Sequence, residues 1–403
     1  MDRLGYGIIG MGGWGVVHLR AVEALEREGE VTLRAVTTTS PDRHREKVDE
    51  LLARGVRVYT DYLEMLQQER ELDIVSIPAP IHLHVPMSMA CFERGLHVML
   101  EKPPAVLVQD VDRIVEAADR CRCLCQVGFQ NVADPAAREL KARIAAGEIG
   151  RVREMVVTVA WCRLDSYYTR ARWAGRLRVG DDWVLDGPLN NPQCHYPHQA
   201  LLVGCSREHD TLRPLTARAE LYRAHRIEGE DILCARAELE EGVTLHTYLT
   251  LCAQDNYPPT IEVVGERGTA IWQLGRYEMK ADAGHVDRSF ELDEVALYRN
   301  LVRAVRGEEP LWSPPAATRN IILHNNGCFA STGVIRPLPE EKVRRTPTPD
   351  GDVLTEVDAL KSLIDQAAAS RRLFSEMGVD WAVETPTVLL DFKSFDPSPL
   401  LGQ

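Results

Sequence analysis

Residues 6–15, YGIIGMGGWG, carry the clearest structural signal in this chain of 403 residues. The apolar run Tyr6–Ile9 predicts a buried strand, and a helical run from Val16 to Leu25 follows it. Between them the sequence matches G-x-G-x-x-G. Its glycines allow a tight turn, close approach of the backbone to a pyrophosphate, and close packing of the helix on the strand. Free N–H groups at the start of the helix favour the phosphates. We therefore predict a dinucleotide-binding loop with the candidate residues Gly10, Gly12, Gly13, Trp14 and Gly15.

Four more apolar runs continue this pattern along the first third of the chain. They predict buried strands at Val31–Thr37, Ile74–Pro78, His97–Leu100 and Leu124–Val127, with amphipathic helical stretches between them. Asp110 is placed to cap the last of these helices. Alternating strands and helices imply right-handed crossovers, so residues 1–128 are expected to form a Rossmann domain with a doubly wound parallel sheet.

The pattern changes in residues 129–335, where longer strands alternate apolar and polar side chains. Leu233–Leu239 and Val243–Leu251 flank a turn at Glu241-Gly242, and Gly265–Gly268 marks a second hairpin. We predict an α/β domain with an open, mostly antiparallel sheet that has helices on one face. A second subunit is one candidate to cover the other face, because large apolar faces rarely stay in water.

The last segment, residues 336–403, is predicted to be an appended extension. Residues 336–350 are polar and contain four prolines, which is typical of a linker or surface arm. A helix is expected over Val357–Met377.

Composition excludes several classes of function. The chain has 47 basic and 60 acidic side chains, a formal net charge of −13, which disfavours a surface built for nucleic acid or anionic lipid. No apolar run is long enough for a membrane helix, and the N-terminus does not resemble a signal peptide. The ten scattered cysteines are therefore expected to be reduced thiols in a cytoplasmic protein. Cys121, Cys123 and Cys125 are expected on one face of a strand as buried residues, and no metal site is predicted.

The end of the second predicted strand bears on the choice of cofactor. Dinucleotide-binding domains that prefer NAD place an acidic residue there, whereas this chain has Thr37-Thr38-Thr39-Ser40, followed by Arg43 and Arg45. Hydroxyls and arginine accept a 2′-phosphate that a carboxylate would repel. We therefore predict NADP or NAD, with NADP favoured, bound near Thr38, Thr39 and Arg43. The alternative is that the arginines are a solvated helix face.

Several ordered motifs give the chain a resemblance to a known family. These are the glycine loop, the stretch IPAPIHLHVPMSMACFERGLHVMLEKP at residues 77–103, and ELKARIAAGEIGRV at residues 139–152. Together they resemble the Gfo/Idh/MocA oxidoreductases, the group that includes glucose-fructose oxidoreductase and inositol dehydrogenase. The resemblance implies a dinucleotide-binding domain and a second domain whose sheet forms a homodimer or homotetramer.

The resemblance also implies roles for residues of the first domain. Glu101-Lys102-Pro103 matches the family's E-K-P signature, in which the lysine binds the reacting oxygen near the nicotinamide. An ammonium group there stabilises a developing alkoxide. Pro80 and His84 resemble the family's loop beside the cofactor, and Asn131 lies where the family contacts nicotinamide or substrate.

The second catalytic element is expected in WVLDGPLNNPQCHYPHQALLVG, residues 183–204. His195 matches the family's proton-transferring histidine. Asn191 and His198 stand where the family usually has aspartates, so Asp186 is a candidate to compensate. An aromatic and basic loop that includes Trp173 precedes this segment and suits a sugar ring.

The function that follows is reversible hydride transfer between NAD(P) and a hydroxyl or carbonyl of a sugar, cyclitol or related carbohydrate. Two alternatives stay open at this point. One is a redox-neutral enzyme that retains its cofactor for epimerisation or glycoside elimination. The other is a non-catalytic, dinucleotide-sensing regulator, against which Lys102 and His195 count.

Overall fold

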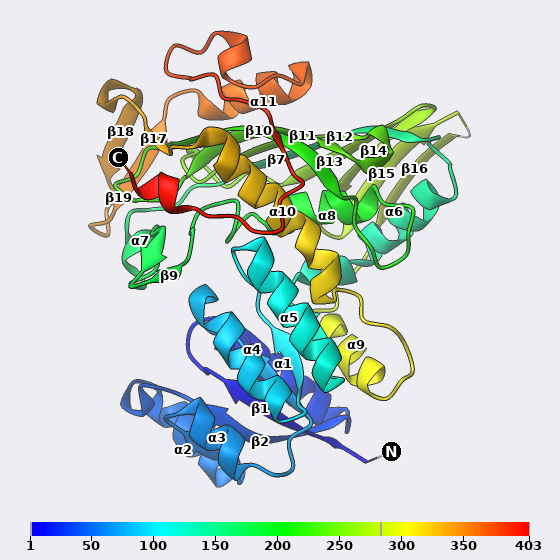
Figure 1. Ribbon diagram of the computed structural model, residues 1–403, viewed down its shortest axis with the longest axis vertical. Helices are drawn as coiled ribbons and strands as arrows, with labels where there is room; N and C mark the ends of the chain where they lie inside the picture. Colours follow the sequence, from blue (N-terminus) through cyan, green and yellow to red (C-terminus); the bar gives the residue numbers. More distant parts are fainter. Residues whose placement is uncertain (1, 283, 403) are drawn as a thin grey trace. The chain divides into compact units, whose positions relative to one another are not determined.

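Six parallel strands form the first sheet of the computed structural model, which describes residues 2–282 and 284–402 (Figure 1). Their order is β3-β2-β1-β4-β5-β6, with β1 at the point where the order reverses. The strands are β1 Leu4–Ile9, β2 Val31–Thr37, β3 Arg57–Tyr59, β4 Ile74–Ile77, β5 His97–Leu100 and β6 Cys125–Val127. This is a doubly wound sheet, and ligands of such sheets bind at the carboxyl ends of the strands near the reversal. The predicted fold class is confirmed.

Helices pack against this sheet through apolar side chains. They are α1 Gly15–Arg27, α2 Arg45–Ala53, α3 Tyr62–Gln68, α4 His84–Glu93, α5 Val108–Cys121 and α9 Ala296–Val305. Met65 of α3, Phe92 of α4 and Ile114 of α5 are buried in one apolar cluster with strand residues such as Val75 and Val98.

Two local expectations in this part of the chain are wrong. Asp110 does not cap α5, because the helix begins two residues earlier at Val108, and the Asp110 carboxylate instead accepts a hydrogen bond from Arg113 at 2.9 Å. The three clustered cysteines do not share a strand face. Cys121 ends α5, Arg122 has a positive φ of 55°, and only Cys125 lies in a strand. The alternate spacing of the three cysteines in the sequence does not show that α5 extends to Cys121.

The second sheet is mixed and mostly antiparallel, as predicted. Its ten strands include the path β16-β15-β14-β13-β7-β12-β11-β10-β17, and β20 also pairs with β10. The pairs β7–β12 and β10–β17 are parallel. The strands are β7 Val152–Ala160, β10 Pro214–Arg223, β11 Ile232–Leu239, β12 Thr244–Thr250, β13 Thr260–Gly265, β14 Gly268–Gln273, β15 Arg276–Ala281, β16 Gly284–Ser289, β17 Arg336–Pro337 and β20 Val388–Leu389.

Helices α6 Pro135–Ala145, α8 His195–Val203 and α10 Pro315–Thr332 run along one face of this sheet (Figure 1). The short helix α7 Ser166–Thr169 and the small strand pair β8 Arg178–Val179 and β9 Asp182–Trp183 precede α8.

The C-terminal segment covers much of the other face, where α11 packs against β7 and β12 (Figure 1). Residues 336–350, predicted to be a linker or arm, instead contribute β17 and the strand β18 Val343–Pro347, which pairs with β19 Val353–Val357. The predicted single helix is shorter. It is α11 Leu360–Ser370, bounded by left-handed Ala359 and Arg371. The side chains that this segment buries against the sheet include Leu338, Val357, Leu360, Ile364, Leu373 and Phe374, opposite Tyr222, Ile232, Cys234 and Tyr248.

This cover changes the expectation about a partner subunit. The chain's own residues close the sheet face over β7, β12, β11 and β10. Assembly through the sheet stays a prediction, and it now concerns the strands β13 to β16, where Ile271 and Leu274 are exposed.

Replacing Phe374 by alanine tests whether the C-terminal segment is part of the core. Phe374 is fully buried, so the free energy of unfolding should fall by about 3–5 kcal/mol. Leu389→Ala in the same segment is the control, because Leu389 is 69% exposed and should cost little. Thermal unfolding of both variants measures the difference, and equal small losses would contradict the assignment.

The chain divides into two compact units. The first comprises Met1–Ala105, Asp110–Ala133 and Asp293–Thr318, and the second comprises Val106–Gln109, Asp134–Leu292 and Arg319–Gln403. The three domain boundaries given above stay a prediction. Across the described residues, no helix combines the length and apolar character needed to cross a membrane.

Candidate active site

The glycine loop lies at the carboxyl end of β1, where the sequence predicted it. Gly10 has a φ of 104°, which strongly favours glycine, and the Met11 N–H donates to the Thr37 carbonyl at 3.0 Å. A Cβ added at Gly15 would collide with the Gly10 carbonyl oxygen. Helix α1 begins at Gly15, and the N–H groups of its first turn, Gly15, Val16 and Val17, donate to the carbonyls of Gly12, Gly13 and Trp14. The positive end of the helix dipole therefore follows the turn directly. This backbone cradle fits the pyrophosphate of a dinucleotide.

The segment after β2 contains the residues predicted to choose between NADP and NAD. Thr38 is buried and accepts a hydrogen bond from the Ser40 N–H at 3.2 Å, whereas Thr39 and Arg43 are exposed. Arg45 is paired with Asp42. The ring of His44, which stands between Arg43 and Arg45 in the basic cluster of the sequence, lies next to Gly12: a Cβ at Gly12 would be 3.1 Å from His44 Nε2.

Glu101 and Lys102 lie directly after β5, and a residue of α1 holds the first of them in place. His18 Nε2 is 2.9 Å from Glu101 Oε1, and both side chains are buried. The other carboxylate oxygen accepts the Lys102 N–H at 3.1 Å. Burial alone would raise the pKa of Glu101, but hydrogen bonding and charge from His18, with the charge of Lys102, hold that pKa below its usual value. The ionised Glu101 therefore ties the Lys102 backbone to the helix that begins at the glycine loop.

His84 supports the same turn from α4. Its Nδ1 lies 2.8 Å from the Pro103 carbonyl oxygen and its Nε2 lies 2.9 Å from the Ala79 carbonyl oxygen. Burial lowers the pKa of His84, and the two carbonyl contacts oppose that shift. Each ring nitrogen of His84 thus lies within hydrogen-bond distance of a backbone carbonyl. Pro80 precedes the short 3-10 turn Ile81–Leu83 that leads into α4.

Asn131 follows β6 in the 3-10 turn Gln130–Ala133. Its side chain is buried, and among the described residues its amide nitrogen has no hydrogen-bond partner. A buried amide donor without a partner is costly, which suits a residue that contacts a ligand.

In the second unit, His195 is the first residue of α8 and Cys194 is the N-cap. His195 is buried but retains 9% exposure, whereas His198, one turn later, is 1% exposed. Burial, followed by the charge of Lys141, lowers the pKa of His198 to about 3. His198 is therefore neutral near pH 7 and belongs to the interior of the helix packing.

Asn191 and Asp186, two of the candidate residues, are brought together. Asn191 Nδ2 donates to Asp186 Oδ1 at 2.7 Å. The other Asp186 oxygen accepts the Gly175 N–H at 2.6 Å. Asp186 thus orients the Asn191 amide and also anchors the loop that carries Trp173.

The loop before α8 is braced by two residues that sequence reasoning missed. Buried Glu230 accepts the Leu189 N–H at 3.2 Å, and a Cβ at Gly187 would collide with the Glu230 carboxylate. Asn325 Nδ2 donates to the Leu189 carbonyl at 2.8 Å from α10. Glu230 and Asn325 lie 41 and 136 residues from Leu189, so local spacing carries no signal for them.

Glu230 makes stability depend on pH in a defined direction. Burial raises its pKa to about 8 from the usual 4.5. The folded chain therefore keeps a proton that the unfolded chain loses, and the associated stability is present below pH 4.5 and is lost as the pH rises toward 8. At about 1.4 kcal/mol per pH unit, the raised pKa of Glu230 lowers the free energy of unfolding at pH 7 by about 3 kcal/mol relative to its value in acid.

Glu230→Gln should remove this dependence, because the amide still accepts the Leu189 N–H and cannot ionise. Relative to the unmodified chain, the variant should gain stability steadily between pH 5 and pH 8. Thermal unfolding midpoints across this range measure the gain, with Glu228→Gln as the control, since that carboxylate is 42% exposed. A constant difference between the two chains would show that Glu230 is ionised when folded.

The aromatic and basic loop packs largely on itself. The Arg170 guanidinium lies 3.6 Å from the Tyr167 ring centroid and 4.9 Å from that of Trp173. Trp161, at the end of β7, contacts Tyr196 of α8 edge-on at 5.8 Å. These contacts give the His195 segment an aromatic boundary.

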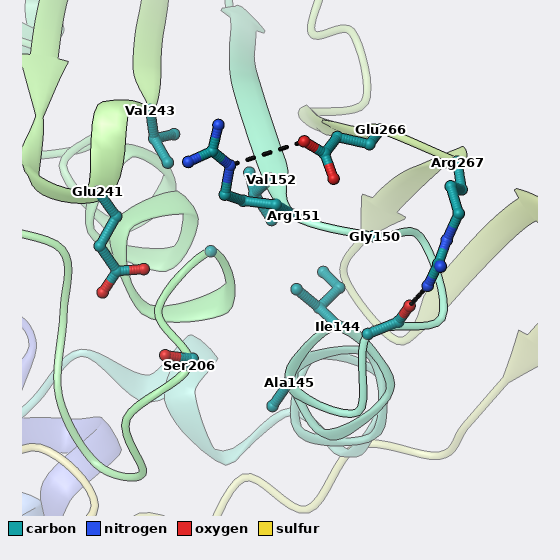
Figure 2. Close-up of a pocket in the computed structure, with 12 residues that line it drawn as sticks. Ile144, Ala145, Gly150, Arg151, Val152, Ser206, Glu241, Val243, Glu266 and Arg267 are labelled. Carbon is teal, nitrogen blue, oxygen red and sulfur yellow. Dashed lines mark hydrogen bonds and ion pairs between the residues drawn. The ribbon is translucent and has the colours of Figure 1, made fainter.

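A pocket of about 360 Å³ opens elsewhere in the second unit (Figure 2). Arg151 and Glu266, which line it, are paired at 3.7 Å, and Arg267 donates to the Gly147 carbonyl at 2.7 Å. None of the predicted site residues lines this pocket, and its remaining charged group, Glu241, is paired with Arg207 at 3.0 Å.

Comparison with known proteins accounts for most of the chain. Residues 4–129 match a model described as an oxidoreductase family with an NAD-binding Rossmann fold, and residues 137–271 match a GFO/IDH/MocA C-terminal domain. A myo-inositol 2-dehydrogenase of Thermotoga maritima is 29% identical over 153 residues, 38% of this chain and 44% of that protein. An inositol 2-dehydrogenase of Saccharopolyspora erythraea is 25% identical over 280 residues, 66% of this chain and 73% of that protein. The first match thus spans less than half of its relative's length.

Solved structures share the fold. The WlbA dehydrogenase of Bordetella pertussis, in complex with NADH and UDP-GlcNAcA, superimposes with a TM-score of 0.70 at 22% identity, over 82% of this chain and 97% of that one. A levoglucosan dehydrogenase in complex with NADH and L-sorbose gives 0.70 at 17% identity, with the same coverage. With two family models that together match well over half of its residues, the chain belongs to the Gfo/Idh/MocA family of NAD-binding oxidoreductases.

Proposed function

We propose that this chain is an NAD(P)-dependent dehydrogenase acting on a hydroxyl or carbonyl of a sugar, cyclitol or related carbohydrate. The observation that carries the proposal is the bond between His18 of α1 and Glu101 at 2.9 Å. It couples the glycine loop to the Lys102 turn at the carboxyl edge of one parallel sheet. The names of the relatives, inositol dehydrogenases, and the ligands of the solved neighbours support the substrate class.

In this proposal Lys102 binds the oxygen of the reacting carbon. A bound nicotinamide dinucleotide would supply the hydride acceptor or donor, held by the backbone of Gly10–Gly15. The Lys102 ammonium lowers the pKa of a substrate hydroxyl and stabilises the alkoxide as charge develops. Glu101 and His84 act through position, because they fix the backbone on either side of Lys102.

His195 takes the hydroxyl proton during oxidation and returns it during reduction, a task suited to an imidazole near neutral pH. Asn191, oriented by Asp186, donates a hydrogen bond to a neighbouring substrate hydroxyl but cannot accept the proton. The neutral, buried His198 contributes packing rather than proton transfer.

The experiment is turnover of purified protein with NADP or NAD across sugars, cyclitols, sugar acids and nucleotide-linked sugars. Formation of the reduced cofactor with one class, saturable in substrate, is the expected result. Tight binding of cofactor without reduction by any class would contradict a simple dehydrogenase.

The preference for NADP has its own test at Arg43, which is exposed beside buried Thr38. Arg43→Ala should weaken NADP binding about tenfold and leave NAD binding unchanged, because only NADP has a 2′-phosphate for the guanidinium. Arg45→Ala is the matched control, since Arg45 is paired with Asp42. Equal weakening of both cofactors by Arg43→Ala would contradict the NADP preference.

A further inference from the structure

Three buried side chains with different donor atoms meet at one end of the second sheet, and the proposed reaction uses none of them. His225 follows β10, Asp231 precedes β11, and Cys252 follows β12. His225 Nδ1 lies 2.9 Å from Asp231 Oδ2 and 3.4 Å from Cys252 Sγ, and the three donor atoms lie within 4.8 Å of one another. Exposure is 4% for His225 and 0% for the other two.

Hydrogen bonding fixes which atoms face the cluster. His225 Nε2 lies 3.1 Å from the Arg163 carbonyl oxygen, which can only accept, so this nitrogen carries a hydrogen. Asp165 Oδ1, at 3.7 Å from the same nitrogen, reinforces that assignment. In a neutral imidazole, the Nδ1 lone pair then points at the Asp231 carboxylate and the Cys252 thiol. Two lone pairs at 2.9 Å repel, so either a hydrogen shared between Nδ1 and the carboxylate or a metal ion has to lie between them.

The contacts around His225 and Asp231 resemble those that orient metal ligands in proteins. A histidine that binds a metal through one nitrogen typically donates the other N–H to a carbonyl or carboxylate, which fixes the ring. Asp231 is held in the same way: the backbone N–H of Ala224 donates to Oδ1 at 2.9 Å, and that of His225 donates to Oδ2 at 2.8 Å. The side chains of His225 and Asp231 are thus each oriented by backbone groups.

Tyr168 provides a separate observation. Its ring packs on the His225 ring with centroids 4.7 Å apart. Its hydroxyl is buried, and within the described part of the chain it has no hydrogen-bond partner. A buried phenol normally finds a partner, and a metal-bound water would provide one.

We propose that His225 Nδ1, Asp231 Oδ2 and Cys252 Sγ bind one zinc ion, with a water molecule in the fourth position next to Tyr168. Tetrahedral zinc separates such nitrogen and sulfur ligands by about 3.6 Å and nitrogen and oxygen ligands by about 3.4 Å. The distances from His225 Nδ1 to Asp231 Oδ2 and to Cys252 Sγ, 2.9 Å and 3.4 Å, therefore need to grow by about 0.5 Å and about 0.2 Å. Binding releases the thiol proton, and one carboxylate and one thiolate then balance the two charges of the ion.

The consequence is a link between parts of the second unit that are distant in sequence. The ion would join the ends of β10, β11 and β12 and, through the N–H of Nε2, the segment that follows β7. That segment contains Trp161, which contacts Tyr196 of α8. The site therefore has a structural role in holding this contact.

The metal content of the full chain tests the proposal. Protein prepared with zinc present and then desalted should retain about one zinc ion per chain. Replacing zinc by Co²⁺ should give the intense visible bands of a tetrahedral site together with a thiolate-to-cobalt absorption in the near ultraviolet. Cys252→Ser and His225→Ala should lose at least about tenfold in zinc content, and Cys252→Ser should lose the thiolate band.

Cys162→Ser is the matched control, because Cys162 is the cross-strand neighbour of Cys252 but does not belong to the group of three. It should retain both the zinc and the cobalt spectrum. The cobalt spectrum of the unmodified chain keeps the test valid if a variant fails to fold. An unmodified chain with neither retained zinc nor a thiolate–cobalt band would overturn the proposal and leave a protonated His225–Asp231 pair. Equal metal content in Cys252→Ser would also overturn it.

Discussion

Replacing Lys102 by alanine is expected to lower kcat by about 10³-fold, the scale of losing a preorganised donor to a developing oxyanion. The turn that carries Lys102 is held by Glu101, which His18 contacts at 2.9 Å, and by the Pro103 carbonyl that contacts His84 at 2.8 Å. Removing the side chain leaves these contacts in place. The loss should therefore appear in kcat, while the dissociation constant for the cofactor changes by less than about threefold.

Two further variants show whether a loss of kcat comes from the position of the Lys102 ammonium or only from removing a positive charge. Arg94→Ala removes an exposed cation at the end of α4 and should leave kcat unchanged. Lys102→Arg keeps a cation but changes its reach, and should recover only part of the activity. If Lys102→Ala retained full kcat, the lysine would have no role at the reacting oxygen.

His195→Gln is expected to lower kcat by about 10²–10⁴-fold, the usual contribution of general acid–base catalysis. It should also change the pH dependence of kcat, because a glutamine amide cannot take up the proton. His198→Gln is the control, because burial keeps the pKa of His198 at about 3 and its charge does not change between pH 5 and pH 9. Its pH profile should keep the shape of the unmodified enzyme.

The two active-site variants should also be non-additive. If Lys102 and His195 serve one proton-transfer and charge-stabilisation step, the double variant should lose far less than the product of the two single losses. An unchanged pH dependence of kcat in His195→Gln would assign proton transfer to another residue.

The glycine loop and the Lys102 turn were predictable because their requirements are local. The strand, the three glycines and the helix follow one another within residues 4–27, and Gly10 has the positive φ that the turn needs. The Lys102 turn also follows a buried strand directly, whereas the role of Lys102 is implied by the family's E-K-P signature. Each signal depends on neighbours in the sequence and on backbone geometry.

Residues that act through long-range contacts were not predictable in this way. His18 lies within an ordinary helical pattern, yet its contact is Glu101, 83 residues away. Glu230 precedes a strand, and only the folded chain shows that it supports Leu189 and crowds Gly187. The zinc ligands proposed above are spread over 28 residues and lack the close spacing of known motifs.

The C-terminal segment shows how composition misleads. Four prolines and many charges in residues 336–350 are typical of a linker, but these residues form one strand that joins the sheet and another in a hairpin. The charged side chains find partners, such as Arg344 with Glu356 at 2.6 Å. The apolar side chains that cover the sheet, including Leu360 and Phe374, come mainly from beyond that stretch.

The central claim is that this chain moves a hydride between a carbohydrate carbon and the nicotinamide. The most direct measurement uses enzyme in excess over cofactor with carbohydrates deuterated at their carbinol carbons, followed by mass analysis of the cofactor. Single-turnover conditions also detect a hydride transfer to the cofactor that is later reversed, as in a redox-neutral enzyme. The account predicts that one deuterium appears at C4 of the nicotinamide with at least one substrate class, and that Lys102→Ala abolishes the transfer. Full occupancy by cofactor with no deuterium transferred from any class would contradict it.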